Sequence, residues 1–278
     1  MFSARSLAQV LAGSILFTQA SWAIDPVAER GFFKTKKGRE MADRAIYEVN
    51  LLISDQGPRL TPSWKQSKRA DDVPVYLVEG HSKAINTPAA VPRGCWCVFV
   101  SPSVLKAWIE HNSSGSGRLN LDAGRFLVFI LMHEVGHINS NTPGAVFKDG
   151  EISQLNVEPS LAKVAEEEAD DFAANILKSR AKQAKVNEAS LTANWVIMEL
   201  TNLSWNMQAF RTLDEFGSFA VGKPSVYFDI GYTHPNLAWR ILRANDHIQQ
   251  TEATRVLLEA FEEARLRGAN PQPLYVKP

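Results

Sequence analysis

The hydrophobic positions along the chain repeat with two periods, one typical of helices and one typical of strands. In Lys37–Ser54 apolar side chains recur every three to four positions, which predicts a helix that buries one face. Val73–Glu79 and Trp96–Val100 are short β-rich runs between turn residues, which predicts strands. Further helices are predicted at Pro102–Glu110, Phe126–Ile138 (with Asp122 as the N-cap), Leu161–Arg180, Ser190–Phe210, Pro235–Asp246 and Thr251–Arg267.

The stretches between these segments are polar and rich in turn residues. Asp55–Lys68 and Gly217–Tyr232 predict irregular connections, and Asn139–Glu158 predicts a polar excursion between two helices. Neither a repeat nor a linker divides the chain. We therefore expect one domain over residues 24–278, with its core over residues 73–246. The predicted fold class is α+β, mostly α, with a small early β-sheet.

The first residues have the pattern of a secretory signal peptide. Arg5 provides positive charge, an interrupted apolar stretch follows at Leu7–Ala20, and Ser21 and Ala23 place small side chains before the expected cleavage site. A membrane anchor is the alternative, but a span needs about 20 consecutive apolar residues. We therefore expect a cleaved signal peptide over residues 1–23 and a soluble mature chain, periplasmic or secreted, without a membrane span.

Composition excludes one class of partner and limits the cysteine chemistry. The 30 Lys and Arg residues balance the 30 Asp and Glu residues, so a strongly basic nucleic-acid-binding protein is not indicated. Cys95 and Cys97 flank Trp96. In a strand their α-carbons would lie roughly 6.5–7 Å apart, at the upper limit for a disulfide. A strained disulfide, two buried thiols and a pair of metal-binding thiolates are all open alternatives.

The sharpest chemical signal lies in the most apolar predicted helix. His133 and His137 are four residues apart, so on a helix both imidazoles project from one face and can bind one zinc ion. Glu134 follows the first histidine and can act as the general base toward a water molecule that zinc activates. Two core histidines are the alternative reading, and a glutamate within so apolar a helix argues against it.

A third zinc ligand is expected on the next long helix. In Ala165–Ala174, Glu166 and Asp170 share one helical stripe with two alanines, which would let this helix pack closely against the histidine helix. Glu166 is the expected ligand, and Asp170 is expected to accept the N–H of a ligating imidazole. Glu167 and Glu168 compete for the ligand role. An ordinary solvated acidic face is the alternative.

A third histidine lies near the carboxyl end of the predicted core. His234 could approach the metal or donate to a developing oxyanion, and Tyr232 could do the latter. The alternative is a helix start, in which Thr233 or His234 caps the helix and Pro235 occupies its first turn. Both readings can hold together.

In this order the three segments resemble the gluzincin metallopeptidases, most closely family M48. Members of that family carry HExxH, then a glutamate in an ExxAD pattern, then HP followed by an arginine. The likeness covers residues 73–246. It implies a gluzincin-type domain in which one zinc ion is bound by His133, His137 and Glu166 and the general base is Glu134.

The same resemblance assigns roles to three further residues. Asp170 would hold a ligating side chain in place, His234 would be a mobile histidine able to reach the metal, and Arg240 would be a nearby structural or substrate-facing charge. Thr142 stands where the family often has a further histidine. The acidic segment also resembles ImmA/IrrE-type metallopeptidases, but the signal peptide and the HP segment count against that family.

We therefore expect a zinc-dependent endopeptidase that acts on unfolded or extended polypeptides, with its substrate along an edge strand near Ala84–Val91. The resemblance suggests a role in quality control of envelope proteins. The alternative is a non-catalytic, chaperone-like protein that holds zinc and peptides, with His234 as a fourth ligand that closes the site. An intact Glu134 favours the enzyme, because zinc binding alone does not need it. The oligomeric state is not predicted.

Overall fold

The computed structural model of the chain describes residues 36–65, 71–78, 87–93, 95–113, 121–142, 145–148, 151–154, 159–207, 237–252 and 254–259. The predicted signal peptide and the segment that holds Tyr232 and His234 lie outside the described residues. The helix predicted over residues 251–267 lies only partly within them, and its residues 254–259 are helical.

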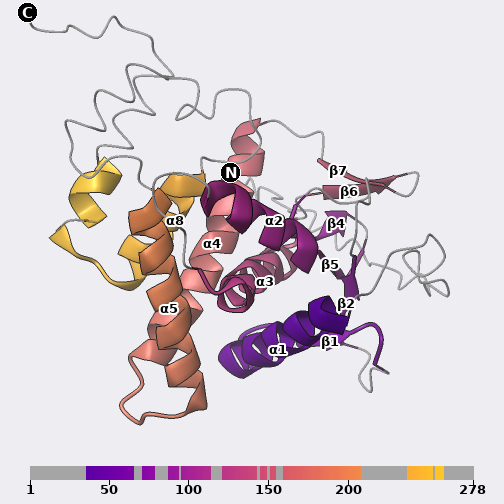
Figure 1. Cartoon of the computed structure of the whole chain (residues 1–278), viewed down its shortest axis with the longest axis horizontal. Coiled ribbons are helices and arrows are strands. Elements are labelled where there is room, and N and C mark those ends of the chain that lie inside the picture. Colours follow the sequence, from indigo (N-terminus) through magenta and orange to yellow (C-terminus); the bar gives the residue numbers. More distant parts are fainter. Residues whose placement is uncertain are drawn as a thin grey trace, which may run out of the picture.

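Helices make up most of the described part of the chain, and they lie close to where the hydrophobic pattern predicts them. Their bounds are Lys36–Ile53 for α1, Pro102–Ser113 for α2, Ala123–Ser140 for α3, Pro159–Ala181 for α4, Glu188–Met207 for α5 and Leu237–Ile248 for α8 (Figure 1). Helix α3 is central, because α1, α2, α4 and α5 all pack against it. Its residues 126–138 are buried almost throughout, as its apolar sequence predicts.

Both ends of α3 are held by specific caps. The Asp122 carboxylate accepts hydrogen bonds from the backbone N–H groups of Gly124 and Arg125, which confirms it as the N-cap. At the other end Asn141 has a φ of 57°, a left-handed conformation that asparagine tolerates, and the N–H of Thr142 donates to the carbonyl of His137. The helix therefore ends about one turn after the second histidine.

A four-stranded mixed sheet lies beside the helices. Its strands follow the order β1 (Leu60–Pro62), β2 (Val73–Leu77), β5 (Val98–Val100) and β3 (Ala89–Ala90). The first three strands are parallel, and β3 pairs antiparallel with β5 at one edge. Valines of β2 and β5 join the main core that the helices form. The predicted small early sheet is therefore present, and β1 is an addition within a segment that we expected to be irregular.

A second, three-stranded sheet takes two of its strands from the segment predicted as a polar excursion. Strand β4 (Pro92–Arg93) pairs in parallel with β6 (Ala145–Lys148), which forms an antiparallel hairpin with β7 (Glu151–Gln154). The excursion between α3 and α4 therefore contains a β-hairpin that the sequence analysis did not predict. The missed signal is Asp149-Gly150, because an Asp-Gly pair between two short runs is a strong indication of a hairpin.

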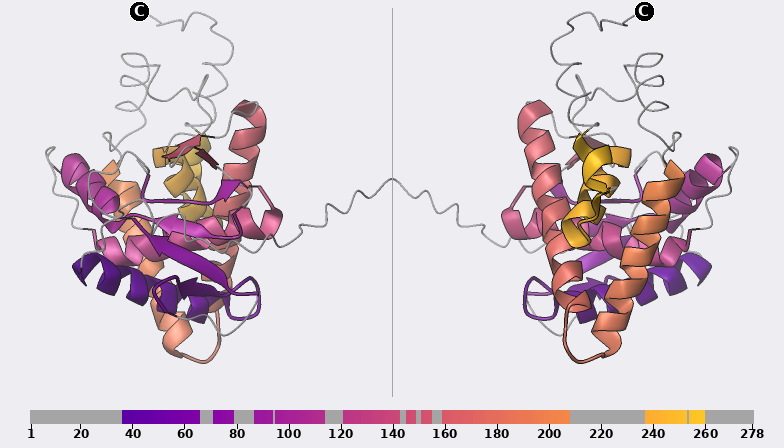
Figure 2. Two further views of the ribbon diagram at one scale, coloured as in Figure 1. Left: turned by 90° about the vertical axis from the view of Figure 1, so that its right-hand side faces the viewer. Right: turned by 90° about the vertical axis from the view of Figure 1, so that its left-hand side faces the viewer.

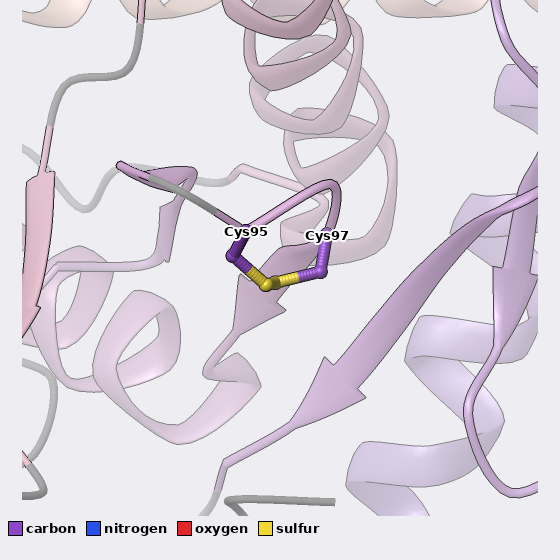
Figure 3. The surroundings of a disulfide bond; sticks show 2 residues. All are labelled: Cys95 and Cys97. Atoms are coloured by element: carbon purple, nitrogen blue, oxygen red, sulfur yellow. A yellow bond between two sulfur atoms is a disulfide. The ribbon is translucent and has the colours of Figure 1, made fainter. Parts of the chain in front are cut away.

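The two cysteines form a disulfide bond at the start of β5 (Figure 3). The strand predicted over Trp96–Val100 begins later than expected, because Trp96 and Cys97 form a bend and β5 begins only at Val98. This bend brings the α-carbons of Cys95 and Cys97 to 5.1 Å, which is well within disulfide reach. Of the three alternatives, the disulfide is the one that the structure contains.

Helices α4 and α5 lie side by side and complete the helical layer with α8 (Figure 2). Helix α8 packs against both of them. Among the helices of the described residues, none is long and apolar enough to cross a membrane. Helix α3 contacts both β3 and α4. Its His137 side chain faces Glu166 of α4.

Candidate metal centre

Helix α3 brings two imidazoles together one turn apart. His133 and His137 are both buried, and their Nε2 atoms are 3.0 Å apart. Their rings meet edge to face, with centroids 4.6 Å apart. This pairing follows from helix geometry alone, because residues i and i+4 share one face.

Helix α4 adds a carboxylate to the same point. The two Glu166 carboxylate oxygens lie 3.4 Å from Nε2 of His133 and 3.3 Å from Nε2 of His137. Glu166 is buried, whereas Glu167 is half-buried and Glu168 is exposed. The structure therefore selects Glu166 from the three successive glutamates as the partner of the imidazoles.

The spacing of these atoms fits a tetrahedral metal ion. Ligands at about 2.0–2.1 Å in a tetrahedral site are separated from one another by roughly 3.3 Å. In the structure the two Nε2 atoms are 3.0 Å apart, and each lies 3.3–3.4 Å from one of the two Glu166 carboxylate oxygens. Among the described residues, His133, His137 and Glu166 are the group whose donor atoms could hold a metal ion. Two imidazoles and one carboxylate form a donor set that zinc commonly takes.

Close helix packing makes this convergence possible. A Cβ atom added at Gly136 would lie 2.8 Å from the Cα atom and 3.0 Å from the carbonyl oxygen of Ala169. Helices α3 and α4 therefore approach each other closely at Gly136 and Ala169, next to the two histidines of α3 and the glutamate of α4. The predicted role of Ala169 as a small packing residue is confirmed, and Ala173 is buried on the same stripe.

Asp170 contacts the far side of one imidazole. Its Oδ1 atom lies 2.9 Å from Nδ1 of His133, so the predicted contact between this carboxylate and a candidate ligand is present. Burial opposes ionisation of Asp170, but the positive charges of Arg240 and His133 outweigh it and lower its pKa to about 2. An ionised Asp170 directs Nε2 of His133 toward Glu166.

Arg240 joins the two carboxylates from a third helix. Its Nη1 atom lies 2.8 Å from Glu166 Oε2, and its Nε and Nη2 atoms lie 2.8 Å and 2.9 Å from Asp170 Oδ2 and Oδ1. Burial opposes ionisation of Glu166, but Arg240 and the two imidazoles hold its pKa well below the ordinary value. Five residues further along α8, the buried Asn245 accepts a hydrogen bond from the Thr201 hydroxyl of α5, so α8 is anchored to α5 as well.

A second ion pair secures α8 next to the first. Arg243 Nη2 lies 2.7 Å from Asp171 Oδ2, and Lys178 Nζ donates to the carbonyl of His247 at 2.6 Å. These residues face one another along α4 and α8. The position of the Arg240 guanidinium is therefore set by the docking of a whole helix.

Besides Asp170, Glu134 is a second carboxylate of the cluster that lies outside the candidate ligand set. It is buried, and burial raises its pKa above the ordinary value, although the positive charges of His133 and His137 act in the opposite direction. A raised pKa makes its carboxylate a stronger base than that of an exposed glutamate. Glu134 also feels the charges of Glu166 and Arg240, which places it beside the same cluster.

The charges of the cluster favour a bound cation. Burial alone would lower the pKa of His133, but the Asp170 and Glu166 carboxylates together outweigh burial and the charge of Arg240 and raise that pKa to about 10. The carboxylates thus stabilise positive charge on this imidazole. The same negative charges would stabilise a metal ion bound at Nε2.

Six of the residues to which the sequence analysis gave a role in the site therefore lie together, and these are His133, Glu134, His137, Glu166, Asp170 and Arg240. His234 lies outside the described residues. From the residues alone the sequence offered no role for Arg240, which entered only through the resemblance. Its signal is the helical spacing from Arg240 to Arg243 and His247, which puts three basic side chains opposite the acidic helix.

Comparison of the chain with models of protein families, with characterised proteins and with solved structures finds no match.

Proposed function

We propose that this chain is a zinc-dependent peptidase of the gluzincin type, similar to family M48. The observation that carries the proposal is the convergence of His133, His137 and Glu166 on one point, with the further buried carboxylate of Glu134 beside them. A purely structural zinc site is closed by four protein ligands and has no use for such a base.

Each residue has one task in this proposal. His133, His137 and Glu166 would hold the ion, and zinc, when bound, polarises a carbonyl group and lowers the pKa of water. Glu134 takes a proton from the attacking water and returns it to the leaving amine. Its burial raises its pKa, which suits a group that must both accept and release a proton near neutral pH.

Asp170 and Arg240 act on the ligands rather than on the substrate. The Asp170 carboxylate accepts from Nδ1 of His133 and so leaves Nε2 free to bind the ion. Arg240 fixes the Glu166 and Asp170 carboxylates relative to each other. The guanidinium also reduces the repulsion between these two buried negative charges.

The proposed substrate is an extended polypeptide that pairs with the edge of β3, which contacts α3. We propose an exported protein with a role in quality control of envelope proteins. The predicted signal peptide supports export, and so does the Cys95–Cys97 disulfide, since disulfides persist mainly in oxidising compartments.

The test is hydrolysis of casein by the zinc-loaded chain, measured as the appearance of new primary amines. We expect the Glu134→Gln variant to bind zinc and to lose at least about 100-fold in rate, because it lacks the base. The matched control is Glu168→Gln, an exposed glutamate on α4, which should retain the wild-type rate.

Two other results would contradict the proposal. Equal rates for wild type and Glu134→Gln would show that Glu134 is not the base or that a contaminant cleaves. Zinc binding by both without cleavage would indicate a zinc-holding peptide binder.

A further inference from the structure

One extended segment connects the two sheets. Ala89–Ala90 forms β3 and Pro92–Arg93 forms β4, with the single residue Val91 between them. The first part pairs with β5 and the second part pairs with β6. The segment therefore belongs to one sheet at its start and to the other at its end.

Strand β6 lies on the edge of this segment that faces away from β5. The Pro88 carbonyl accepts from the Ser101 N–H at 2.8 Å, so residue 88 faces β5, and successive residues of a strand alternate between edges. Ala89 and Val91 consequently face the opposite edge. A hydrogen bond from the Thr87 hydroxyl to the Ala89 carbonyl is consistent with this orientation, because that carbonyl is not bonded to β5.

The pairing of β4 with β6 uses that same edge. Pro92 pairs with Ala145, but proline has no N–H. In a parallel ladder the bonds to Ala145 must then come from the residues on either side, which are the Val91 carbonyl and the Arg93 N–H. Beyond Ala89, the outward edge of the segment is therefore already occupied by Ala145.

This occupied edge lies close to the candidate ligands. Strand β3 contacts α3, and the Thr142 N–H donates to the carbonyl of His137 at 2.9 Å. Ala145 follows Thr142 by three residues, which span at most about 11 Å. The start of β6 therefore lies near the end of α3 that carries His137, one of the candidate ligands.

We propose that the β6–β7 hairpin blocks one end of the peptide-binding edge, so that substrates are cleaved within a few residues of one chain end. This inference rests on the proposed peptidase function and replaces the endopeptidase expected from sequence. A peptide strand that pairs with Ala89 would meet Ala145 end to end. A peptide antiparallel to β3 would present its amino end to the hairpin, and a parallel one its carboxyl end.

The test uses peptides that share one cleavable core and carry roughly 2, 4 or 8 added Gly/Ser residues at either end. Zinc-loaded wild type should lose at least about 10-fold in kcat/KM on long extensions at one end only. The end that is sensitive identifies the strand direction. Equal rates for long extensions at both ends would overturn the proposal.

Two variants connect the length limit to the hairpin. Ala145→Pro removes the N–H that bonds to Val91. Proline is tolerated at the first position of a strand, so we expect the variant to fold. Its rates on long peptides should move toward those on short ones. Ala145→Ser keeps this N–H and should behave as wild type. Replacement of Ala145–Gln154 by a short Gly/Ser linker should abolish the length limit, and a limit unchanged in both Ala145→Pro and the linker variant would contradict the proposal.

Peptide binding measured without cleavage tests this inference independently of the proposed function. The same peptides, labelled with a fluorophore, are titrated with Glu134→Gln and followed by anisotropy. If wild type fails to cleave but binding shows the one-sided length limit, the peptidase proposal fails and the hairpin inference stands. If binding tolerates long extensions at both ends, or if no peptide binds, the hairpin inference fails.

Discussion

Asp170 shows how much of this site depends on single contacts. Its carboxylate is shared between Nδ1 of His133, at 2.9 Å, and the guanidinium of Arg240. The neighbouring Asp171 pairs with Arg243 instead and is about one-third exposed. Two adjacent aspartates therefore differ in their contacts, because the helix points one of them at the imidazole and the other at a more solvated ion pair.

The pKa of Asp170 predicts a stability change in acid. Because its folded-state pKa is about 2 and its ordinary value is 3.8, ionised Asp170 stabilises the fold above about pH 4, and this stabilisation is lost as the pH falls toward 2. The loss amounts to about 2 kcal/mol. Urea unfolding with EDTA present should show the wild type losing this much more stability between about pH 5 and pH 2.5 than Asp170→Asn does.

The control for this experiment is Asp171→Asn, which should follow the wild-type pH dependence. A wild type and an Asp170→Asn variant with parallel pH curves would show that the Asp170 carboxylate does not carry the effect.

At the scale of elements, the contact between α3 and α4 decides whether a metal centre exists. The histidines belong to α3 and Glu166 belongs to α4, so the distance between donor atoms is set by how closely the two helices approach. Gly136 and Ala169 form the point of closest approach. Any side chain at position 136 would move the glutamate away from the imidazoles.

Gly136→Ala should therefore weaken both the fold and the site. Its Cβ would lie 2.8 Å from the backbone of Ala169, which cannot rotate away as a side chain could. We expect a loss of about 1–3 kcal/mol in the free energy of unfolding. We also expect zinc affinity to fall at least about 10-fold in competition with a chromophoric chelator, because one ligand is displaced.

The matched control is Gly124→Ala in the same helix. There the added Cβ meets side-chain atoms, Asp122 Oδ1 at 3.2 Å and Met41 Cγ at 4.0 Å, which can shift. We expect its stability to change by less than about 1 kcal/mol and its zinc affinity to stay at the wild-type value. If Gly136→Ala matched this control, the close approach of the helices would not limit metal binding.

For the whole molecule, the proposed ion would join helices that are distant in sequence. Helix α3 lies at the centre of the core, and α4 is held in turn by α5 and α8. An ion bound between α3 and α4 stabilises the folded state by mass action, by about 4 kcal/mol at a concentration 1,000 times Kd. Loss of the ion should therefore reduce the thermal stability of the entire fold.

Chelation should consequently lower Tm. For a domain of this size, about 4 kcal/mol corresponds to a shift of about 8–16 °C. Differential scanning calorimetry with zinc and with EDTA should show this difference, and added zinc should restore the higher value. His137→Ala should have one Tm under both conditions, and a wild-type Tm that does not respond to EDTA would contradict metal binding at this site.

The sequence by itself determined the features that depend on neighbouring residues. Helical periodicity places α1 to α5 and α8, Asp122 caps α3 because its side chain reaches the next turn, and the spacing of His133 and His137 puts both imidazoles on one face. These are local interactions within a turn or two of helix. The local sequence therefore encodes them independently of how distant segments pack.

Only the tertiary structure decided the features that join distant segments. The helical stripe favoured Glu166, but only the docking of α4 on α3 excludes its competitors Glu167 and Glu168. Arg240 reaches the site only because α8 packs on α4. The pairing of Pro92 with Ala145 likewise joins positions far apart in the chain. Docking angle and strand register result from packing over the whole core, and local hydrophobic periodicity does not encode them.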